Sequence, residues 1–137
     1  MDKNEVLNKA LRYKKMNEIF IDFCSRFAKA FPSGNRFGIE IGKGNPVERE
    51  LTIFNHPAKI EFGFSNIGGV VTGSISFYRV THNDHRVRIA RIYFNKSGDW
   101  RAESEVSGWT CSFKDDLDYT NRLSVIILDG FFNNPIS

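Results

Sequence analysis

The chain has 137 residues, and its 19 Lys and Arg residues against 16 Asp and Glu residues give a net charge of +3. A charge this small does not by itself indicate nucleic-acid binding. Hydrophobic residues make up 41% and charged residues 26%, a globular balance that excludes a disordered chain. The 13 phenylalanines require a substantial core and the length suits one core, so we expect a single folded domain over residues 1–137.

Residues 2–31 have the pattern of an amphipathic helix. Asp2 followed by Glu5 is typical of a capping box in which Asp replaces Ser or Thr. Pro32 and Gly34 end the segment. Apolar side chains at helical spacing define the predicted buried face, which consists of Val6, Ala10, Tyr13, Phe20, Phe23, Phe27 and Phe31.

Residues 36–106 change to a period of two, which indicates β-strands. Turn sequences such as GKGNP and HNDH separate the segments, and links this short require neighbouring strands to be antiparallel. Interior glycines allow the sheet to bend, so we expect it to curl. The six predicted strands cover 36–42, 48–54, 58–64, 70–80, 85–95 and 99–106.

Strand register supports this arrangement, because pairing outward from each turn keeps one face apolar throughout. The opposite face then holds polar residues, among which Arg91 is expected to pair with Glu103. The expected apolar pairs are Ile39–Ile53, Leu51–Phe62, Ile60–Ile75, Phe64–Val71, Phe77–Ala90, Ile75–Ile92, Ile92–Ala102 and Phe94–Trp100.

A second helix is expected over residues 115–131, with Ser112 or Asp115 as its N-cap and with Leu117 among its apolar residues. A sheet with one apolar face needs a cover, and two amphipathic helices can provide it. The predicted fold is therefore α+β: a two-layer domain in which a curled six-stranded antiparallel meander (36–106) packs one face against an N-terminal helix (2–31) and a C-terminal helix (115–131).

The hairpin between the fourth and fifth predicted strands has the strongest charge pattern. Residues 79–101 carry 6 basic and 2 acidic side chains, whereas residues 102–137 carry 2 basic and 6 acidic ones. A two-residue Asn83-Asp84 turn would place Arg79 opposite Arg88, and like charges in such pairs need a counter-charge. The acidic C-terminal segment, a partner chain or a ligand could supply it.

Both strands of this hairpin change polarity at the same level. In the predicted register Arg79, Arg86 and Arg88 share one face, and Tyr78, Val80, Val87 and Ile89 share the other. Paired bulges would explain the change, and so would a hairpin that runs past the ends of the helices.

An apolar hairpin face rimmed by arginines is typical of a protein interface, although an ion-pair cluster satisfied within the chain would give the same pattern. We predict a non-catalytic protein-binding protein of the adaptor, inhibitor, chaperone or immunity type, whose partner is another protein or a second copy in a homodimer. Trp109, in the loop GWTCSF, is either a further contact or a plug for the core. The predicted partner-binding residues are Tyr78, Arg79, Val80, Arg86, Val87, Arg88, Ile89 and Trp109.

Catalytic and metal-binding patterns are scarce. The sequence has no nucleophile elbow, phosphate-binding glycine loop or paired-His helix motif. Cys24 fits helix packing, whereas Cys111, in a loop before a predicted helix, is the better candidate for an exposed thiol. His82, Asp84 and His85 could bind a metal only with an open geometry, and a turn explains the Asn-Asp pair. We expect no enzymatic activity, no metal and no cofactor.

The order of helix, meander and helix resembles helix-grip domains in outline, which implies a small-molecule-binding alternative with a cavity between sheet and helices. It is also similar to small bacterial binding proteins such as secretion chaperones and toxin-immunity proteins. Nucleic-acid binding on the polar sheet face is a second alternative, for which Tyr93 is the obvious stacking residue. No apolar run has signal-peptide or membrane-spanning length, so we expect a cytoplasmic protein with no membrane partner.

Overall fold

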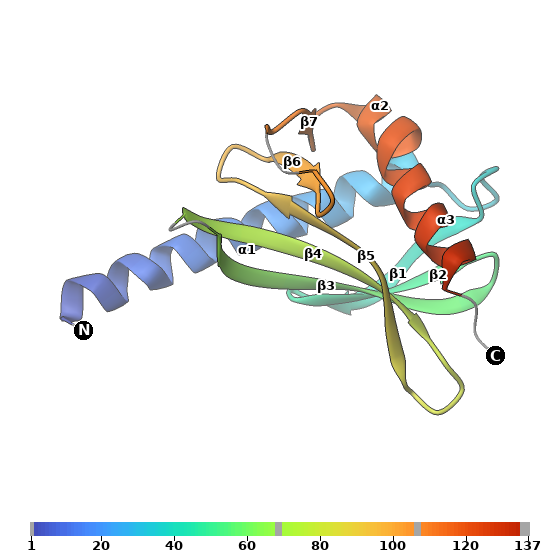
Figure 1. Cartoon of the computed structure of the whole chain (residues 1–137), viewed down its shortest axis with the longest axis horizontal. Coiled ribbons are helices and arrows are strands. Elements are labelled where there is room, and N and C mark those ends of the chain that lie inside the picture. The colour runs from blue at the N-terminus through green and yellow to red at the C-terminus, as the bar shows by residue number, and fades with distance from the viewer. Residues whose placement is uncertain (1, 68–69, 106–107, 135–137) are drawn as a thin grey trace.

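The computed structural model describes residues 2–67, 70–105 and 108–134, and within them seven antiparallel strands form one curled sheet in chain order (Figure 1). The predicted meander is confirmed, with one strand more than predicted. The extra strand is only two residues long and follows a loop, so it has no alternating pattern of its own. The strands are β1 (Ile39–Asn45), β2 (Glu48–Ile53), β3 (His56–Ile67), β4 (Val70–Val80), β5 (Arg86–Phe94), β6 (Asp99–Ala102) and β7 (Cys111–Ser112).

Helices cover the apolar face of the sheet, as predicted (Figure 1). Asp2 caps the first helix by accepting the Glu5 N–H at 2.9 Å. Asp115 caps the C-terminal helical segment by accepting the Leu117 N–H, whereas the alternative cap Ser112 lies in β7. The helical elements are α1 (Lys3–Ala30), α2 (Asp116–Asp118), the π-helical turn η1 (Tyr119–Leu123) and α3 (Ser124–Asn133).

Aromatic rings fill the space between the two layers. Phe20, Phe23 and Phe27 of α1 are fully buried, with centroids of successive rings 6.3 and 5.6 Å apart. The Phe113 ring lies 4.9 Å from that of Phe23, and the Tyr119 hydroxyl donates to the Phe113 carbonyl at 2.9 Å. The segment after β7 and the turn η1 are thereby packed into the same core as α1.

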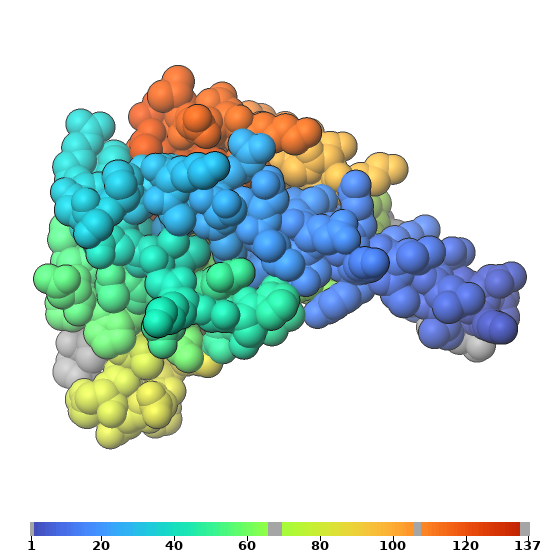
Figure 2. Space-filling model, turned by 180° about the vertical axis from the view of Figure 1, so that it is seen from behind, coloured from blue at the N-terminus to red at the C-terminus, as the bar shows by residue number. Residues whose placement is uncertain are grey.

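The first half of α1 extends beyond the sheet and has no core to cover (Figures 1 and 2). Every residue from 2 to 15 is exposed, so the predicted burial of Val6, Ala10 and Tyr13 was wrong. Tyr13 marks the edge of the core, because its ring lies 5.5 Å from that of Phe62. Helical periodicity identifies the apolar face of a helix but not the place where the sheet beneath it ends.

At the other end of the chain, Leu117 was predicted to face the core but is exposed. The cause is the π-helical turn η1, which adds one residue per turn and so rotates the face that a regular helix would present. Tyr119 and Leu123 of η1 are buried instead.

The turn between β2 and β3 differs from the predicted one. Phe54 and Asn55 have positive φ angles of 48° and 64° and form this turn, which the sequence had placed at residues 55–57. Leu51 therefore pairs with Ala58 rather than Phe62. The shift is an even number of residues, so the apolar face is preserved.

The β3–β4 pairs are also displaced by an even number of residues, so the apolar face is again preserved. Ile60 pairs with Phe77 rather than Ile75, and Phe64 pairs with Gly73 rather than Val71. Residues 68–69, which connect these strands, lie outside the described residues, as does Val106 of the predicted last strand.

Gly130 allows α3 to lie directly on β5. An ideal Cβ at this position would overlap the carbonyl oxygen of Ile89. The absence of a side chain at Gly130 therefore sets the distance between helix and strand.

Gly130→Ala should destabilise the protein by about 1–3 kcal/mol, because the helix must move away from β5. In an exposed helix interior the same change would stabilise the protein by up to about 1 kcal/mol. A loss of stability would therefore show that Gly130 lies against β5. Urea denaturation measures it, with Val125→Ala on the exposed side of α3 as a control expected within about 0.5 kcal/mol. Equal stability of Gly130→Ala and the unaltered chain would contradict the close approach.

Candidate interaction site at the β4–β5 hairpin

The β4–β5 hairpin projects from the body of the domain (Figures 1 and 2). β3 pairs with β4 as far as Arg79, and β6 pairs with β5 only from Ile92 to Phe94. Beyond these levels, no strand of the described chain flanks the hairpin. Its tip is therefore a two-stranded element whose edges pair with no other described strand.

The turn at the tip has three residues rather than the predicted two. Thr81 donates its N–H to the His85 carbonyl at 2.9 Å, and Asp84, with a φ of 58°, closes the loop. A loop of this kind shifts the strand register by one residue relative to an Asn83-Asp84 turn. A one-residue shift exchanges the two faces of one strand.

A single bulge in β5 then restores the register nearer the base. Phe77 pairs with Ala90, but the next residue, Tyr78, pairs with Arg88, which leaves Ile89 as the extra residue. The two irregularities cancel, so the predicted Phe77–Ala90 pair is confirmed although the register at the tip was wrong. Of the two hairpin strands, β5 is bulged and β4 is not. The explanation by paired bulges required a bulge in both.

The predicted faces of the hairpin must therefore be corrected. Arg79 lies on the inner face, opposite Val87, whereas Arg86 and Arg88 lie on the outer face, opposite Val80 and Tyr78. The three arginines do not share a face. Ile89, predicted to lie on the exposed apolar face, is buried in the bulge, and Val87 is separated from Tyr78 and Val80.

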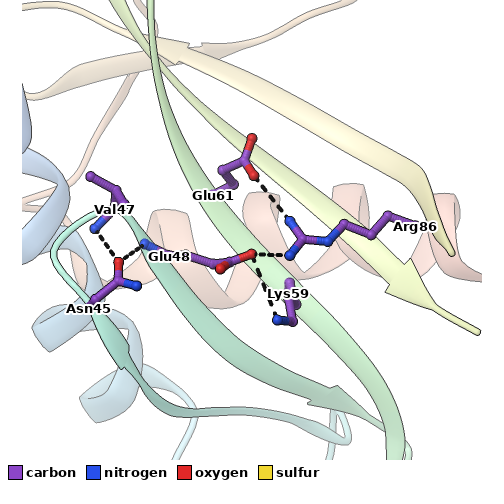
Figure 3. Close-up of polar contacts among 6 residues, drawn as sticks. All are labelled: Asn45, Val47, Glu48, Lys59, Glu61 and Arg86. Atoms are coloured by element: carbon purple, nitrogen blue, oxygen red, sulfur yellow. Dashed lines mark hydrogen bonds and ion pairs between the residues drawn. The ribbon is translucent and has the colours of Figure 1, made fainter. Parts of the chain in front are cut away.

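Arg86 is paired within the chain (Figure 3). Its guanidinium contacts Glu48 and lies 3.1 Å from Glu61, and Lys59 lies 3.8 Å from the same Glu48 carboxylate. Asn45 fixes the approach of β2 by accepting the N–H of Glu48 at 2.9 Å. The counter-charges for Arg86 thus come from β2 and β3 rather than from the acidic C-terminal segment.

Arg88 and Arg91 share Glu103, at 3.6 and 3.5 Å, which confirms the predicted Arg91–Glu103 pair. The Tyr93 hydroxyl donates to the same carboxylate at 3.1 Å. Half-exposed pairs of this kind contribute only about 0–1 kcal/mol each. Charged side chains and a bulge are, however, the usual means of preventing another strand from pairing with a free edge.

Arg79 is buried, with 7% of its surface exposed, and joins the hairpin to the end of α3. Its Nη1 donates to the carbonyls of Phe131 and Asn134 at 3.1 and 3.3 Å, and its guanidinium lies 4.0 Å from the centroid of the Phe131 ring. The last carbonyls of a helix carry partial negative charge, so the cation is favourably placed there.

An apolar area adjoins this contact; we call Phe54, Val87, Phe131 and Phe132, of which Phe131 is buried and the others are exposed, the aromatic patch. The Phe54 ring lies 6.0 Å from the rings of both Phe131 and Phe132. Val87 belongs to the patch because it pairs with Arg79, which stacks on Phe131. The exposed fractions are 44% for Phe54, 39% for Val87 and 63% for Phe132.

Sequence reasoning missed Phe54 and Phe132. Phe54 was placed at the end of a strand, and Phe132 lay just beyond the predicted helix 115–131. The available signal was the pair of adjacent phenylalanines at the end of a helix, because two consecutive positions cannot both face the core.

Trp109, also a predicted contact residue, lies in another part of the molecule. It is exposed, and the Arg101 guanidinium lies 5.3 Å from its ring and 5.2 Å from that of Tyr93. Arg101 pairs with Tyr93 near the end of β5 that is remote from the hairpin tip. The structure therefore does not bring Trp109 together with the other predicted contact residues.

Both thiols are buried, so the predicted exposure of Cys111 was wrong. Cys111 lies in β7, paired with Trp100 of β6, rather than in a loop. Burial raises the pKa of Cys24 to about 12 and also raises the pKa of Cys111. In the described ranges, no three His, Cys, Asp or Glu residues gather in a way that would hold a metal ion.

A surface groove of about 570 Å³ lies between the first half of α1 and the turn after β5. It is open to solvent and lies outside the ring-filled space between the two layers. Its apolar lining includes Leu11, Met16, Val70 and Val71, and its charged lining includes Arg12, Lys15 and Lys96.

Comparison with known proteins gives no family model, no curated protein and no solved structure that matches the chain. Among the helices described here, none combines the length and apolar character needed to cross a membrane. The function is therefore inferred from the surface of this chain itself.

Arg79→Ala should lower the free energy of unfolding by about 2–4 kcal/mol, because it removes two charge-assisted hydrogen bonds and a cation–π contact from a buried site. Arg88→Ala, which removes a half-exposed ion pair of the same hairpin, should cost less than about 1 kcal/mol. Urea denaturation compares the two variants, and similar losses would contradict the different roles assigned to these arginines.

The native thiols should react with a disulfide reagent at pH 8 at least about a hundredfold more slowly than in urea, because the thiolate is the reactive form and burial raises the thiol pKa. The rate for Cys24 should still be rising between pH 8 and pH 10, since its pKa is about 12. The single variants Cys24→Ala and Cys111→Ala separate the two sites. Rapid reaction of the native Cys24→Ala protein would contradict the burial of Cys111.

Proposed function

We propose that the chain is a non-catalytic protein-binding protein that acts through the aromatic patch and the projecting β4–β5 hairpin. The observation that carries the proposal is the exposure of Phe54, Val87 and Phe132 in one area beside the hairpin. Exposed apolar groups rimmed by polar ones mark interaction sites, and aromatic side chains are enriched at the centres of interfaces.

The backbone holds Phe54 in a fixed position before any partner arrives. Its N–H donates to the Gly38 carbonyl at 2.7 Å, and its ring lies where a side chain on Gly38 would be. The positive φ of Phe54 is unfavourable for an aromatic residue, and such strain is concentrated at functional sites. A contact residue that is already ordered loses less conformational entropy on binding.

Polar groups around the patch would orient a partner. His56 lies next to it, with its ring 5.7 Å from that of Phe131, and His82 and His85 are exposed at the hairpin tip. Arg86 and Arg88 are paired within the chain, so we assign them to protection of the β5 edge and to the rim of the interface rather than to its centre.

The proposed partner is a protein, and the type of partnership (adaptor, inhibitor, chaperone or immunity protein) depends on its identity. Cytoplasmic localisation is part of the proposal, because Cys24 and Cys111 are both free thiols. Trp109 is left out of the proposed interface because of its position near the opposite end of β5.

The double variant Val87→Ser/Phe132→Ser should reduce partner capture from native lysate of the source organism by at least about tenfold, because it removes the apolar contact area without changing the core. Urea denaturation verifies that the fold is retained. The control is Val125→Ser, which changes an exposed residue on another side of α3 and should leave capture unchanged. If the same proteins are retained equally by the double variant and the unaltered chain, the patch is not the binding site.

A further inference from the structure

The first half of α1 packs on the sheet only near its end, where the Tyr13 ring lies 5.5 Å from that of Phe62. Residues 2–15 are all exposed, and isolated helices of this length are marginal in water. Leu7 and Leu11 are two of its exposed apolar residues, and Leu11 is 65% exposed. A contact outside the domain would therefore stabilise this half of the helix.

The side of α1 that faces away from the sheet has a regular seam, which we call the outer stripe. Its residues alternate at spacings of four and three, the spacing by which one helix packs along another. All are exposed, and Figure 2 shows α1 running uncovered across this side of the molecule. The outer stripe consists of Leu7, Leu11, Lys14, Glu18, Ile21 and Ser25.

Charge divides α1 into two halves. The first half is basic, and Lys14 lies in the stripe. The second half carries two acidic and two basic side chains and is neutral overall, and Glu18 lies in the stripe. Beside the second half lies a depression of about 410 Å³, whose lining includes the Asp22–Arg26 ion pair and the exposed Leu117. Within the outer stripe, Lys14 of one copy is thus complementary to Glu18 of another.

We propose that two copies of the chain associate through their outer stripes, with the two α1 helices packed antiparallel about a two-fold axis. One register places Leu11 against Ile21 of the partner subunit, Lys14 against the partner's Glu18 and Leu7 against the partner's Ser25. Each contact then occurs twice, as a closed symmetric dimer requires.

This register uses features on both halves of α1. Leu7 enters the depression beside the partner's Leu117, and Lys14 lies opposite the partner's Glu18. A parallel pair would instead set the two basic halves side by side, which costs free energy. A membrane surface would use the basic half but would leave Ile21 and Leu117 without a role. The second copy is therefore the occupant that accounts for the whole stripe.

Light scattering on the full chain tests the proposal. The unaltered chain should have twice the mass of one 15.7 kDa chain at micromolar concentrations. Leu11→Glu should give the mass of a monomer with unchanged circular dichroism, because Leu11 is 65% exposed. Val125→Glu, at an exposed site on α3, should remain dimeric.

A charge exchange tests the antiparallel register. Lys14→Glu and Glu18→Lys should each raise the dissociation constant by about tenfold or more, because each places like charges opposite one another in both halves of the dimer. An equimolar mixture should recover the dimer, since the carboxylate introduced in one chain then faces the ammonium group introduced in the other and the native pair remains at the second position. A merely structural effect on α1 would not be reversed by mixing.

A monomeric mass of the unaltered chain up to about 100 μM would overturn the proposal, as would failure of the two charge variants to associate with each other. Binding of the monomer to vesicles of phosphatidylserine and phosphatidylcholine would also overturn it and assign the basic half to a membrane surface. These results are independent of partner capture through the aromatic patch, so either proposal can fail while the other stands.

Discussion

The contact between Arg79 and the end of α3 determines the shape of the exposed surface. A buried guanidinium on β4 binds two C-terminal carbonyls of the helix and stacks on Phe131. The same contact turns Phe132 outward and brings it beside Phe54. Gly130 lets the helix touch the backbone of Ile89. The position of α3 is therefore set by two contacts: this close approach and the Arg79 guanidinium at the end of the helix.

The remaining arginines of the hairpin serve a different purpose. A free strand edge invites pairing with another chain, and β5 is free over Arg86–Ile89 in the described structure. The bulge at Ile89 and the ion pairs of Arg86 and Arg88 make this edge irregular and charged. Side chains on the inner face, rather than the strand edge, are therefore the surface suited to a partner.

The sequence allowed the fold to be predicted because five hairpins each had to keep one face apolar. An error of two or four residues, as at Leu51 or Phe64, does not change a face and does no harm. The strand register at the hairpin tip was predicted wrongly, because a three-residue loop and a bulge each shift the register by one residue. Neither feature has a distinctive sequence. Arg79 was placed on the correct face, but its burial depends on α3, which is 45 or more residues away in the sequence.

The two proposed surfaces have a common physical origin. The aromatic core ends near Tyr13 at one side of the domain and near Phe131 at the other, and the chain continues beyond both limits. Apolar residues on these extensions are the same types that fill the core, so periodicity alone cannot distinguish them. They are distinguished by the charged residues beside them. These are the basic residues in the first half of α1 on one side of the domain, and Arg86 and Arg88 at the edge of β5 on the other. A charge inside the core needs a partner, as Arg79 has in the carbonyls at the end of α3, so such charges are few there.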